Sequence, residues 1–285
     1  MKFEDLEVES EKENTWCPGC GNFGLLNAVK KAVKRLEEEG VGRERLLISA
    51  GIGCHGKIFD YLNLSGLYSI HGREISTIQG MKFADPDLKV MAFGGDGDAY
   101  GEGLAHLIYA ARRNADVTMI VHNNENYALT TGQKSPTSVE GFKGPSSPKG
   151  SVDEPLNPLT IMLSSGAGFV SRGYSGDIKH LTDLIVEAVK HEGFSLVDVL
   201  QPCVTFNDTY EKYNDLVEVI DEPAKTREEA VGLAEEKERL PIGILYKEEM
   251  PVFNEKVYPD KNPVEDKMDE EERLEAVKDI LDGKR

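Results

Sequence analysis

The sequence has 285 residues, of which 39% are hydrophobic, and it carries a formal net charge of −18 at pH 7. This length suits one large domain, or one domain with appendages, and the apolar content is sufficient for a core. Nucleic acid and anionic membrane surfaces are excluded as partners because they would repel so acidic a chain. No stretch approaches the ~20 consecutive apolar residues that a membrane-spanning helix needs.

The N-terminal part predicts an arm, a helix and a strand, in that order. Residues 1–13 are charged and lack apolar periodicity, which favours a partly ordered arm. Apolar residues then recur at helical spacing from Leu25 to Leu36, and Gly40 ends the predicted helix. Residues 45–50 predict a strand that leads directly into a glycine-containing turn.

The next segment contains the pattern strand, glycine turn, helix, strand. Residues 90–93 form a continuous apolar run, as expected of a parallel strand buried on both faces. A glycine turn and a helix through about Arg113 follow, and residues 117–121 predict another strand. Such a unit requires a crossover and therefore a parallel sheet. We predict an α/β fold with a mostly parallel central sheet and helices on both faces.

A long segment without periodicity separates this unit from the next predicted elements. Residues 135–158 are rich in Ser, Pro, Gly and Lys, and their length predicts a functional or mobile loop. Apolar spacing over residues 178–189 predicts another amphipathic helix, and residues 194–200 predict another buried strand. We expect a turn over residues 171–176.

The C-terminal part becomes acidic after about residue 222. Helices are predicted over residues 228–239 and 269–281. We therefore divide the chain into the N-terminal arm, a main domain over residues 14–222 and an acidic C-terminal extension over residues 223–285. We expect the extension to lack a core of its own and to pack on a partner or over the site.

The four cysteines each lie beside glycine or proline: Cys17 and Cys20 in Trp-Cys-Pro-Gly-Cys-Gly, Cys54 in Gly-Ile-Gly-Cys, and Cys203 in Gln-Pro-Cys. A Cys-x-x-Cys pair with two distant cysteines supplies four thiolates, the complement of an iron–sulfur cluster or a structural zinc. The alternative is four unrelated core cysteines. A disulfide framework is disfavoured because the cysteines are few for the length and no secretory signal is evident, so we expect a cytoplasmic protein.

A second group of polar residues predicts a magnesium–diphosphate site. Asp96 lies between two glycines after one predicted strand, and Asn124 follows the next strand. Parallel strands present their carboxyl ends to one crevice, where α/β folds bind ligands. A carboxylate, an amide oxygen and a nearby backbone carbonyl supply half of the oxygen shell of Mg²⁺, and glycines let the backbone approach phosphate. The alternative is an ordinary turn in which Asp96 caps a helix.

These motifs together resemble the β subunit of the 2-oxoacid:ferredoxin oxidoreductases, which bind thiamine diphosphate. The motifs that carry the resemblance occur over roughly residues 14–220. In chain order they are Trp16-Cys17-Pro18-Gly19-Cys20-Gly21, Gly51-Ile52-Gly53-Cys54, His71-Gly72-Arg73, Gly95-Asp96-Gly97-Asp98, the segment from Asn124 to Gln133, and Gln201-Pro202-Cys203. The resemblance implies the thiamine diphosphate-binding fold. It also implies that the four cysteines hold a [4Fe–4S] cluster, and that Asp96, Asn124 and the backbone of Asn126 hold Mg²⁺.

The resemblance further implies which residues form the cofactor and substrate sites. The implied cofactor-binding residues are Ile52, Gly53, His71, Gly72, Arg73, Gly95, Asp96, Gly97, Asp98, Asn124, Asn126, Tyr127, Ala128, Leu129 and Thr130. Lys57 and Leu129 correspond to residues near the substrate. For His71-Gly72-Arg73 the alternative is a turn with solvated side chains, and His122 is expected to be a hydrogen-bonded core histidine.

The implied activity is the oxidative decarboxylation of a 2-oxo acid, 2-oxoglutarate or pyruvate, with coenzyme A as co-substrate. The products are an acyl-CoA and CO₂, and the electrons pass through the cluster to ferredoxin. The resemblance implies an α subunit as partner, in a heterodimer or a dimer of heterodimers, which supplies the glutamate for the cofactor's aminopyrimidine. Two alternatives remain: a non-redox thiamine diphosphate decarboxylase or synthase, and a four-cysteine zinc or electron-transfer subunit without thiamine.

The sequence offers few cations for docking an acidic ferredoxin. The candidates are Arg172 in the predicted turn and Lys143 and Lys149 in the long loop. Because the net charge is −18, we expect docking to depend on the partner subunit or on apolar contact.

Overall fold

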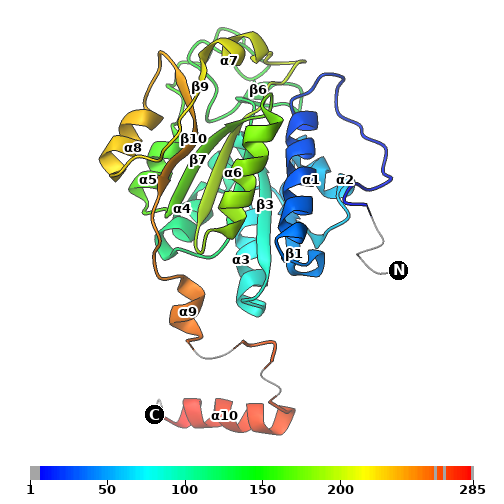
Figure 1. Cartoon of the computed structure of the whole chain (residues 1–285), viewed down its shortest axis with the longest axis vertical. Helices are drawn as coiled ribbons and strands as arrows, with labels where there is room; N and C mark the ends of the chain where they lie inside the picture. Colours follow the sequence, from blue (N-terminus) through cyan, green and yellow to red (C-terminus); the bar gives the residue numbers. More distant parts are fainter. Residues whose placement is uncertain (1–6, 260–261, 266–267, 284–285) are drawn as a thin grey trace.

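The computed structural model describes residues 7–259, 262–265 and 268–283. In this part of the chain eight strands form one sheet, in the order β2-β1-β3-β4-β8-β7-β10-β9 (Figure 1). The strands are β1 Leu46–Ala50, β2 Ser65–Tyr68, β3 Lys89–Gly95, β4 Thr118–Asn123, β7 Phe169–Tyr174, β8 Ser195–Leu200, β9 Val217–Val219 and β10 Leu240–Lys247. Neighbouring strands are parallel, except that β10 runs antiparallel to β7.

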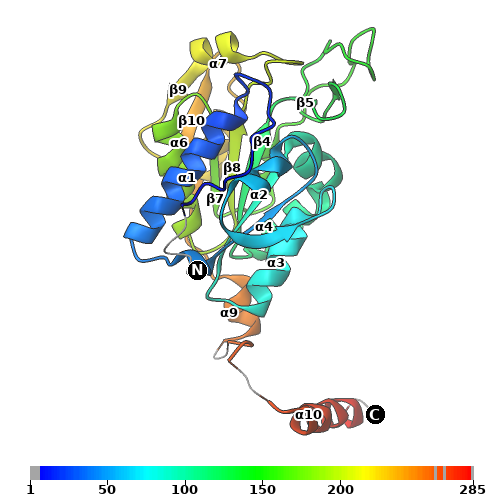
Figure 2. The same cartoon turned by 90° about the vertical axis from the view of Figure 1, so that its right-hand side faces the viewer.

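Helices cover both faces of the sheet, as Figures 1 and 2 show. The helices are α1 Asn22–Glu38, α2 Ile58–Tyr61, α3 Glu74–Ala84, α4 Leu104–Arg113, α5 Pro158–Ser164, α6 Ile178–Lys190, α7 Tyr210–Leu216, α8 Arg227–Ala234, α9 Phe253–Val257 and α10 Glu270–Asp282. The predicted α/β class with a mostly parallel sheet is therefore confirmed. Among the described residues no helix is both long enough and apolar enough to span a membrane.

The alternation of side chains along the strands divides the core into two layers. Met91 and Phe93 of β3 pack with α1, α2 and α6, whereas Val90 and Ala92 of the same strand pack with α3, α4, α5 and α8. Strands β4, β7 and β8 are buried along their whole length because both of their faces are covered. This packing fixes the carboxyl ends of the strands at one edge, where the polar motifs begin.

The residues after 222 were expected to form an extension without a core, but part of them belongs to the main sheet. Strand β10 lies between β7 and β9 in the main sheet, and its Leu245 is buried in the core. The helix predicted to reach residue 239 ends at Ala234, because the chain then turns into this strand. A proline and a glycine interrupt the alternation of apolar and polar residues in Leu240–Lys247, so the sequence pattern did not predict this strand.

Helix α10 lies apart from the main body, at the end opposite to α7 (Figures 1 and 2). None of its described residues is buried. The helix predicted over residues 269–281 is confirmed, but it does not pack over the strand ends that carry the polar motifs.

The structure also corrects the predictions of a turn over residues 171–176 and of Arg172 as a docking cation. The turn predicted over residues 171–176 is confined to residues 175–176. Residues 169–174 form the buried strand β7, and Arg172 within it is only 8% exposed. Polar Ser171 and Arg172 beside a glycine concealed the strand. Arg172 therefore cannot serve as a surface cation, whereas Lys143 and Lys149 are exposed.

Candidate functional site

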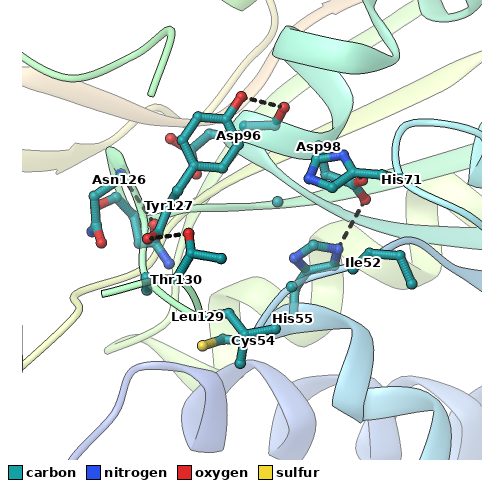
Figure 3. A pocket seen from close by; sticks show the side chains of 15 residues that line it. Ile52, Cys54, His55, His71, Asp96, Asp98, Asn126, Tyr127, Leu129 and Thr130 are labelled. Carbon is teal, nitrogen blue, oxygen red and sulfur yellow. Dashed lines mark hydrogen bonds and ion pairs between the residues drawn. The ribbon is translucent and has the colours of Figure 1, made fainter. Parts of the chain in front are cut away.

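A cavity of about 80 Å³ opens at the carboxyl ends of β1, β3 and β4 (Figure 3). Its walls are formed by Ile52, Gly53, Cys54, His55, His71, Gly95, Asp96, Gly97, Asp98, Asn124, Asn126, Tyr127, Ala128, Leu129 and Thr130. The structure thus brings together nearly all of the residues assigned to the cofactor from sequence. It adds His55 and Cys54, whereas Gly72 and Arg73 do not line this cavity, which we call the cofactor cavity.

Gly72 and Arg73 lie outside the lining of the cavity and stabilise it through hydrogen bonds. The backbone N–H of Gly72 donates to Asp98 Oδ1 at 2.6 Å, and the φ of +67° at Gly72 suits glycine. The Arg73 guanidinium donates to the backbone carbonyls of Gly72 and Glu102. These two residues stabilise the turn that carries His71, so they position His71 in the cavity wall.

The glycines beside Asp96 allow a tight wall. A Cβ atom at Gly97 would lie 2.2 Å from the Tyr127 ring, and one at Gly95 would lie 2.7 Å from His55 Nδ1. After Asp96 the chain enters a π-helical turn, Gly97–Glu102, a distortion frequent at functional sites. Larger residues here would separate the Tyr127 and His55 walls from the turn.

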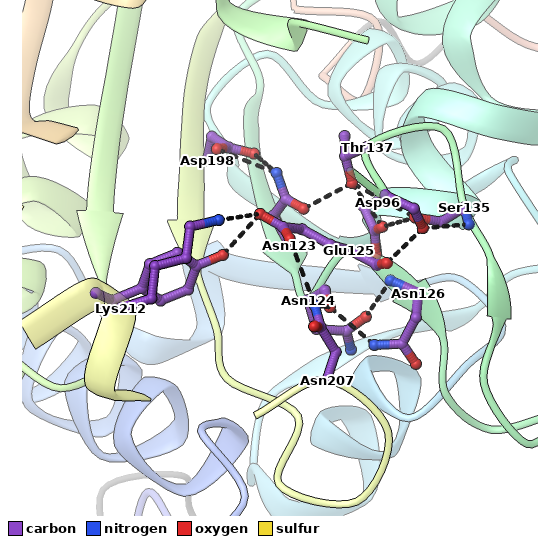
Figure 4. A network of polar contacts seen from close by, with 12 residues as sticks. Asp96, Asn123, Asn124, Glu125, Asn126, Ser135, Thr137, Asp198, Asn207 and Lys212 are labelled. Atoms are coloured by element: carbon purple, nitrogen blue, oxygen red, sulfur yellow. Dashed lines mark hydrogen bonds and ion pairs between the residues drawn. The ribbon is translucent and has the colours of Figure 1, made fainter. Parts of the chain in front are cut away.

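Asp96 is a buried carboxylate with two hydroxyl donors (Figure 4). Ser135 Oγ and Thr137 Oγ1 donate to its Oδ2 at 2.5 and 2.8 Å. Burial raises the pKa of Asp96 to about 6, although these two hydrogen bonds act in the opposite direction. Ser135 and Thr137 were not assigned to the site from sequence, since they belong to the long loop and reach Asp96 only through the fold.

Asn124 and Asn126 present further oxygen atoms beside Asp96 (Figure 4). Asn124 Oδ1 accepts from the backbone N–H of Asn126 at 3.2 Å, and Asn126 Nδ2 donates to the Asn124 carbonyl at 2.8 Å. Among the described residues nothing donates to Asn126 Oδ1, which is buried. One carboxylate, neutral amide oxygens and an unsatisfied buried acceptor suit a hard divalent cation.

The backbone at Glu125, between these two asparagines, is strained, and neighbouring side chains stabilise it. Glu125 adopts a φ of +57°, in the left-handed region that non-glycine residues seldom occupy. Tyr213 Oη donates to Glu125 Oε1 at 2.9 Å, and Lys212 Nζ lies 3.7 Å from the same oxygen. Asn207 Nδ2 donates to the Asn124 carbonyl at 3.0 Å. These contacts offset the strain and fix the direction of both asparagines.

Asp98 holds two histidines on the opposite wall (Figure 3). His55 Nε2 lies 2.9 Å from Asp98 Oδ2, and His71 Nδ1 lies 2.9 Å from Oδ1. Glu74 is buried nearby, and desolvation together with the Asp98 charge raises its pKa to about 9. Glu74 is therefore neutral at pH 7. Neither His55 nor Glu74 was assigned to this site from the sequence.

The four cysteines line a second cavity, of about 60 Å³, together with Trp16, Lys57 and Asn124. We call it the cysteine cavity. It shares Cys54, Asn124 and Ala128 with the cofactor cavity, so the two have a common wall. No three His, Cys, Asp or Glu side chains in the described ranges converge enough to hold a metal ion. The thiols surround a space instead of meeting at one point.

Burial disfavours the thiolate forms of Cys20 and Cys54 in this cavity. It raises the pKa of Cys20 to about 11, and the other three cysteines add to the rise. Burial also raises the pKa of Cys54, although the Lys57 ammonium opposes it. Bound cationic iron would reverse this penalty, because coordination favours the thiolate.

The two residues expected near the substrate lie in different cavities. Leu129 is half exposed on the wall of the cofactor cavity. Lys57 lines the cysteine cavity instead, where its Nζ donates to the Thr15 carbonyl at 3.3 Å. His122 is a buried histidine hydrogen-bonded to Asn22 Oδ1 at 2.8 Å, as expected.

Comparison with known proteins identifies the family. Residues 51–199 match the model of the thiamine pyrophosphate enzyme C-terminal TPP-binding domain, and residues 203–262 match the C-terminal model of the pyruvate ferredoxin oxidoreductase beta subunit. The chain is 40% identical to the 2-oxoacid:ferredoxin oxidoreductase subunit beta of Sulfolobus sp., over 94% of this chain and 95% of the relative. The chain belongs to the β subunits of the 2-oxoacid:ferredoxin oxidoreductases. It is thus a subunit of an oxidoreductase.

Other members of this family are named for one 2-oxo acid. The chain is 38% identical to 2-oxoglutarate synthase subunit KorB of Archaeoglobus fulgidus, over 85% of this chain and 88% of the relative. A solved 2-oxoglutarate:ferredoxin oxidoreductase from Magnetococcus marinus, with 2-oxoglutarate, coenzyme A and succinyl-CoA bound, superposes with a TM-score of 0.88. The two are 34% identical, and the match covers 97% of each chain.

Proposed function

We propose that this β subunit binds Mg²⁺–thiamine diphosphate in the cofactor cavity and a [4Fe–4S] cluster in the cysteine cavity. With a partner α subunit it oxidatively decarboxylates a 2-oxo acid, 2-oxoglutarate or pyruvate, and coenzyme A receives the acyl group. Ferredoxin is the proposed electron acceptor. The observation that carries this proposal is the common wall of the two cavities, formed by Cys54, Asn124 and Ala128.

The donor set beside Asp96 fits a magnesium diphosphate. Asp96, Asn124 and the backbone of Asn126 would hold the cation, and the unsatisfied buried side-chain Oδ1 of Asn126 is a further oxygen beside them that supports a cation at this place. The glycine turn at 95–97 would admit the diphosphate close to the backbone. Thiamine diphosphate, when bound, supplies the electron sink for decarboxylation. The chain's own residues bind and orient it, with Tyr127 packed on the turn.

Four thiols around a space support a cluster over a mononuclear zinc. A zinc ion needs its ligands to converge at about 2.3 Å from one point, whereas here the cysteines line the walls of a cavity. Their positions beside the cofactor cavity also suit a redox role. A non-redox thiamine enzyme has no use for four thiols at this place.

The proposed active site is completed by a second chain. Within the described residues the cofactor cavity is lined by Asp96 and Asp98 but by no glutamate. The glutamate that acts on the aminopyrimidine would therefore come from the α subunit, in a heterodimer or a dimer of heterodimers. We propose that Leu129 borders the substrate and that Lys57 acts near Cys54, at the edge of the same space.

The test is anaerobic purification of this chain with its co-encoded partner. We expect iron and acid-labile sulfide at four per β subunit, as a [4Fe–4S] cluster requires, with bound thiamine diphosphate and Mg²⁺. The complex should reduce ferredoxin with coenzyme A and at least one of 2-oxoglutarate, pyruvate and branched 2-oxo acids. Zinc in place of iron, or turnover without an electron acceptor, would contradict the proposal.

A further inference from the structure

Gln201 contacts both sites with a single side-chain amide. It is fully buried at the carboxyl end of β8, where its backbone N–H donates to the Asn123 carbonyl at 3.0 Å. Its Oε1 accepts from Asn124 Nδ2 at 3.2 Å. Its Nε2 donates to Cys20 Sγ at 3.7 Å and to the Pro202 carbonyl at 2.5 Å. One amide thus bridges a proposed magnesium ligand and a proposed cluster ligand.

The surroundings fix which end of the amide faces which site. Asn124 Oδ1 accepts from the backbone N–H of Asn126, so its Nδ2 must face Gln201 and requires an acceptor there. On the other side the Pro202 carbonyl accepts from Gln201, and a flipped amide would place its Oε1 against this carbonyl oxygen. A flipped Gln201 amide would therefore lose both contacts. The N–H group is directed to the sulfur by these neighbours.

Close packing keeps the amide in place. A Cβ atom at position 21 would lie 2.9 Å from Gln201 Nε2, so Gly21 gives this amide the space beside the Cys-x-x-Cys loop. The backbone N–H of Gly21 also donates to the Pro202 carbonyl at 3.1 Å. The loop that carries Cys20 and the segment that carries Cys203 are joined at this point.

We propose that Gln201 is a positioning residue that couples the magnesium–cofactor site to the cluster. This inference rests on the proposed cofactor assignments. An N–H donor to a ligand sulfur stabilises the more negative, reduced cluster and so raises its reduction potential. The other end of the amide holds Asn124. A cation held by Asn124 Oδ1 would polarise the Asn124 amide, strengthen its Nδ2–H contact with Gln201 Oε1 and, through the Gln201 amide, strengthen the N–H···S contact. The coupling would be reciprocal.

The experiment is a redox titration of the anaerobic complex with its partner subunit, followed by the EPR signal of the reduced cluster. Gln201→Met removes both ends of the amide at similar size. At the midpoint potential of the wild type, we expect the ratio of reduced to oxidised cluster in Gln201→Met to be three- to tenfold lower than in the wild type. A tenfold change corresponds to 59 mV for one electron. Adding Mg²⁺ and thiamine diphosphate to cofactor-depleted complex should raise the wild-type potential and leave that of Gln201→Met unchanged.

Tyr210→Phe is the matched control. Tyr210 Oη donates to the Gly19 carbonyl at 3.1 Å, so it holds the same loop by a hydrogen bond to a carbonyl oxygen instead of a sulfur. Its potential should equal that of the wild type. The inference would be overturned if the reduction potential of Gln201→Met equalled that of the wild type. It would also be overturned if the cofactor raised the potential of Gln201→Met as much as that of the wild type. Absence of any cluster from the wild type would overturn the proposed function as well.

Should Gln201→Met lose its cluster, the wild type alone still decides. Pulsed EPR of the reduced complex with ¹⁵N in its glutamine side chains should show a ¹⁵N coupling to the cluster. No such coupling would mean that the amide does not contact the sulfur, and would refute the inference.

Discussion

Asp96→Asn should stabilise the cofactor-free protein while it abolishes cofactor binding. In the absence of a cation the buried Asp96 carboxylate is costly to ionise, and burial raises its pKa to about 6 from the usual 3.8. At about 1.36 kcal/mol for each pKa unit, this difference amounts to about 3 kcal/mol. Asparagine keeps the shape and avoids the charge.

The pH dependence follows from the sign of this difference. Between pH 3.8 and about 6 the folded protein retains a proton on Asp96 that the unfolded chain releases. The contribution of Asp96 to stability is therefore fully present below pH 3.8 and is lost as the pH rises through about 6. The advantage of Asp96→Asn should be about 3 kcal/mol at pH 7.5 and about half of that at pH 5.

The assay is urea denaturation of cofactor-free protein at both pH values, with Mg²⁺–thiamine diphosphate binding measured by calorimetry. Thr137→Val is the contrasting variant: it removes a donor to Asp96 Oδ2 and should destabilise by about 1–3 kcal/mol. A cofactor-free Asp96→Asn protein less stable than wild type at pH 7.5 would refute the reasoning. So would undiminished cofactor affinity in that variant.

Three further outcomes are expected. Glu74→Gln should stabilise the protein increasingly from pH 4.5 towards 9, because the folded state retains a proton on Glu74 that the unfolded state loses; urea denaturation at pH 5 and 8 checks this, and equal gains at both would contradict it. A chain ending at residue 265 should keep its Tm within about 2 °C by calorimetry, since no described residue of α10 is buried. Ferredoxin reduction should stay flat or rise from low to moderate salt, given the net charge of −18; a steep fall that Lys143→Gln with Lys149→Gln abolishes would instead place docking on the long loop.

The parts of the fold that sequence could predict are those set by local patterns. The helix over 22–38 and the strands around the Asp96 turn follow from apolar spacing and glycine turns, and both are confirmed. Strand β10 could not be predicted in its place, because its position between β7 and β9 depends on pairing with distant residues. Arg172 was misplaced for the same reason, since only the sheet shows that its strand is central.

The candidate site shows the same limit. Residues directly after a strand could be assigned, because parallel strands end at one edge of the sheet. The supporting contacts come from elsewhere: Ser135 and Thr137 reach Asp96 from the long loop, and Asp98 joins His55 and His71 from two separate turns. No spacing in the sequence encodes these distances. The tertiary packing creates them.

The strand order explains how one chain could carry both proposed sets of ligands. The adjacent strands β1, β3, β4 and β8 lead into Cys54, Asp96, Asn124 and Cys203 respectively. The inner two strands lead into the proposed oxygen ligands and the outer two lead into thiols. Gln201, at the end of β8, returns towards Asn124 of β4. A cofactor and a cluster bound at these strand ends would share a wall without any chain segment between them, which is the arrangement that electron transfer between them requires.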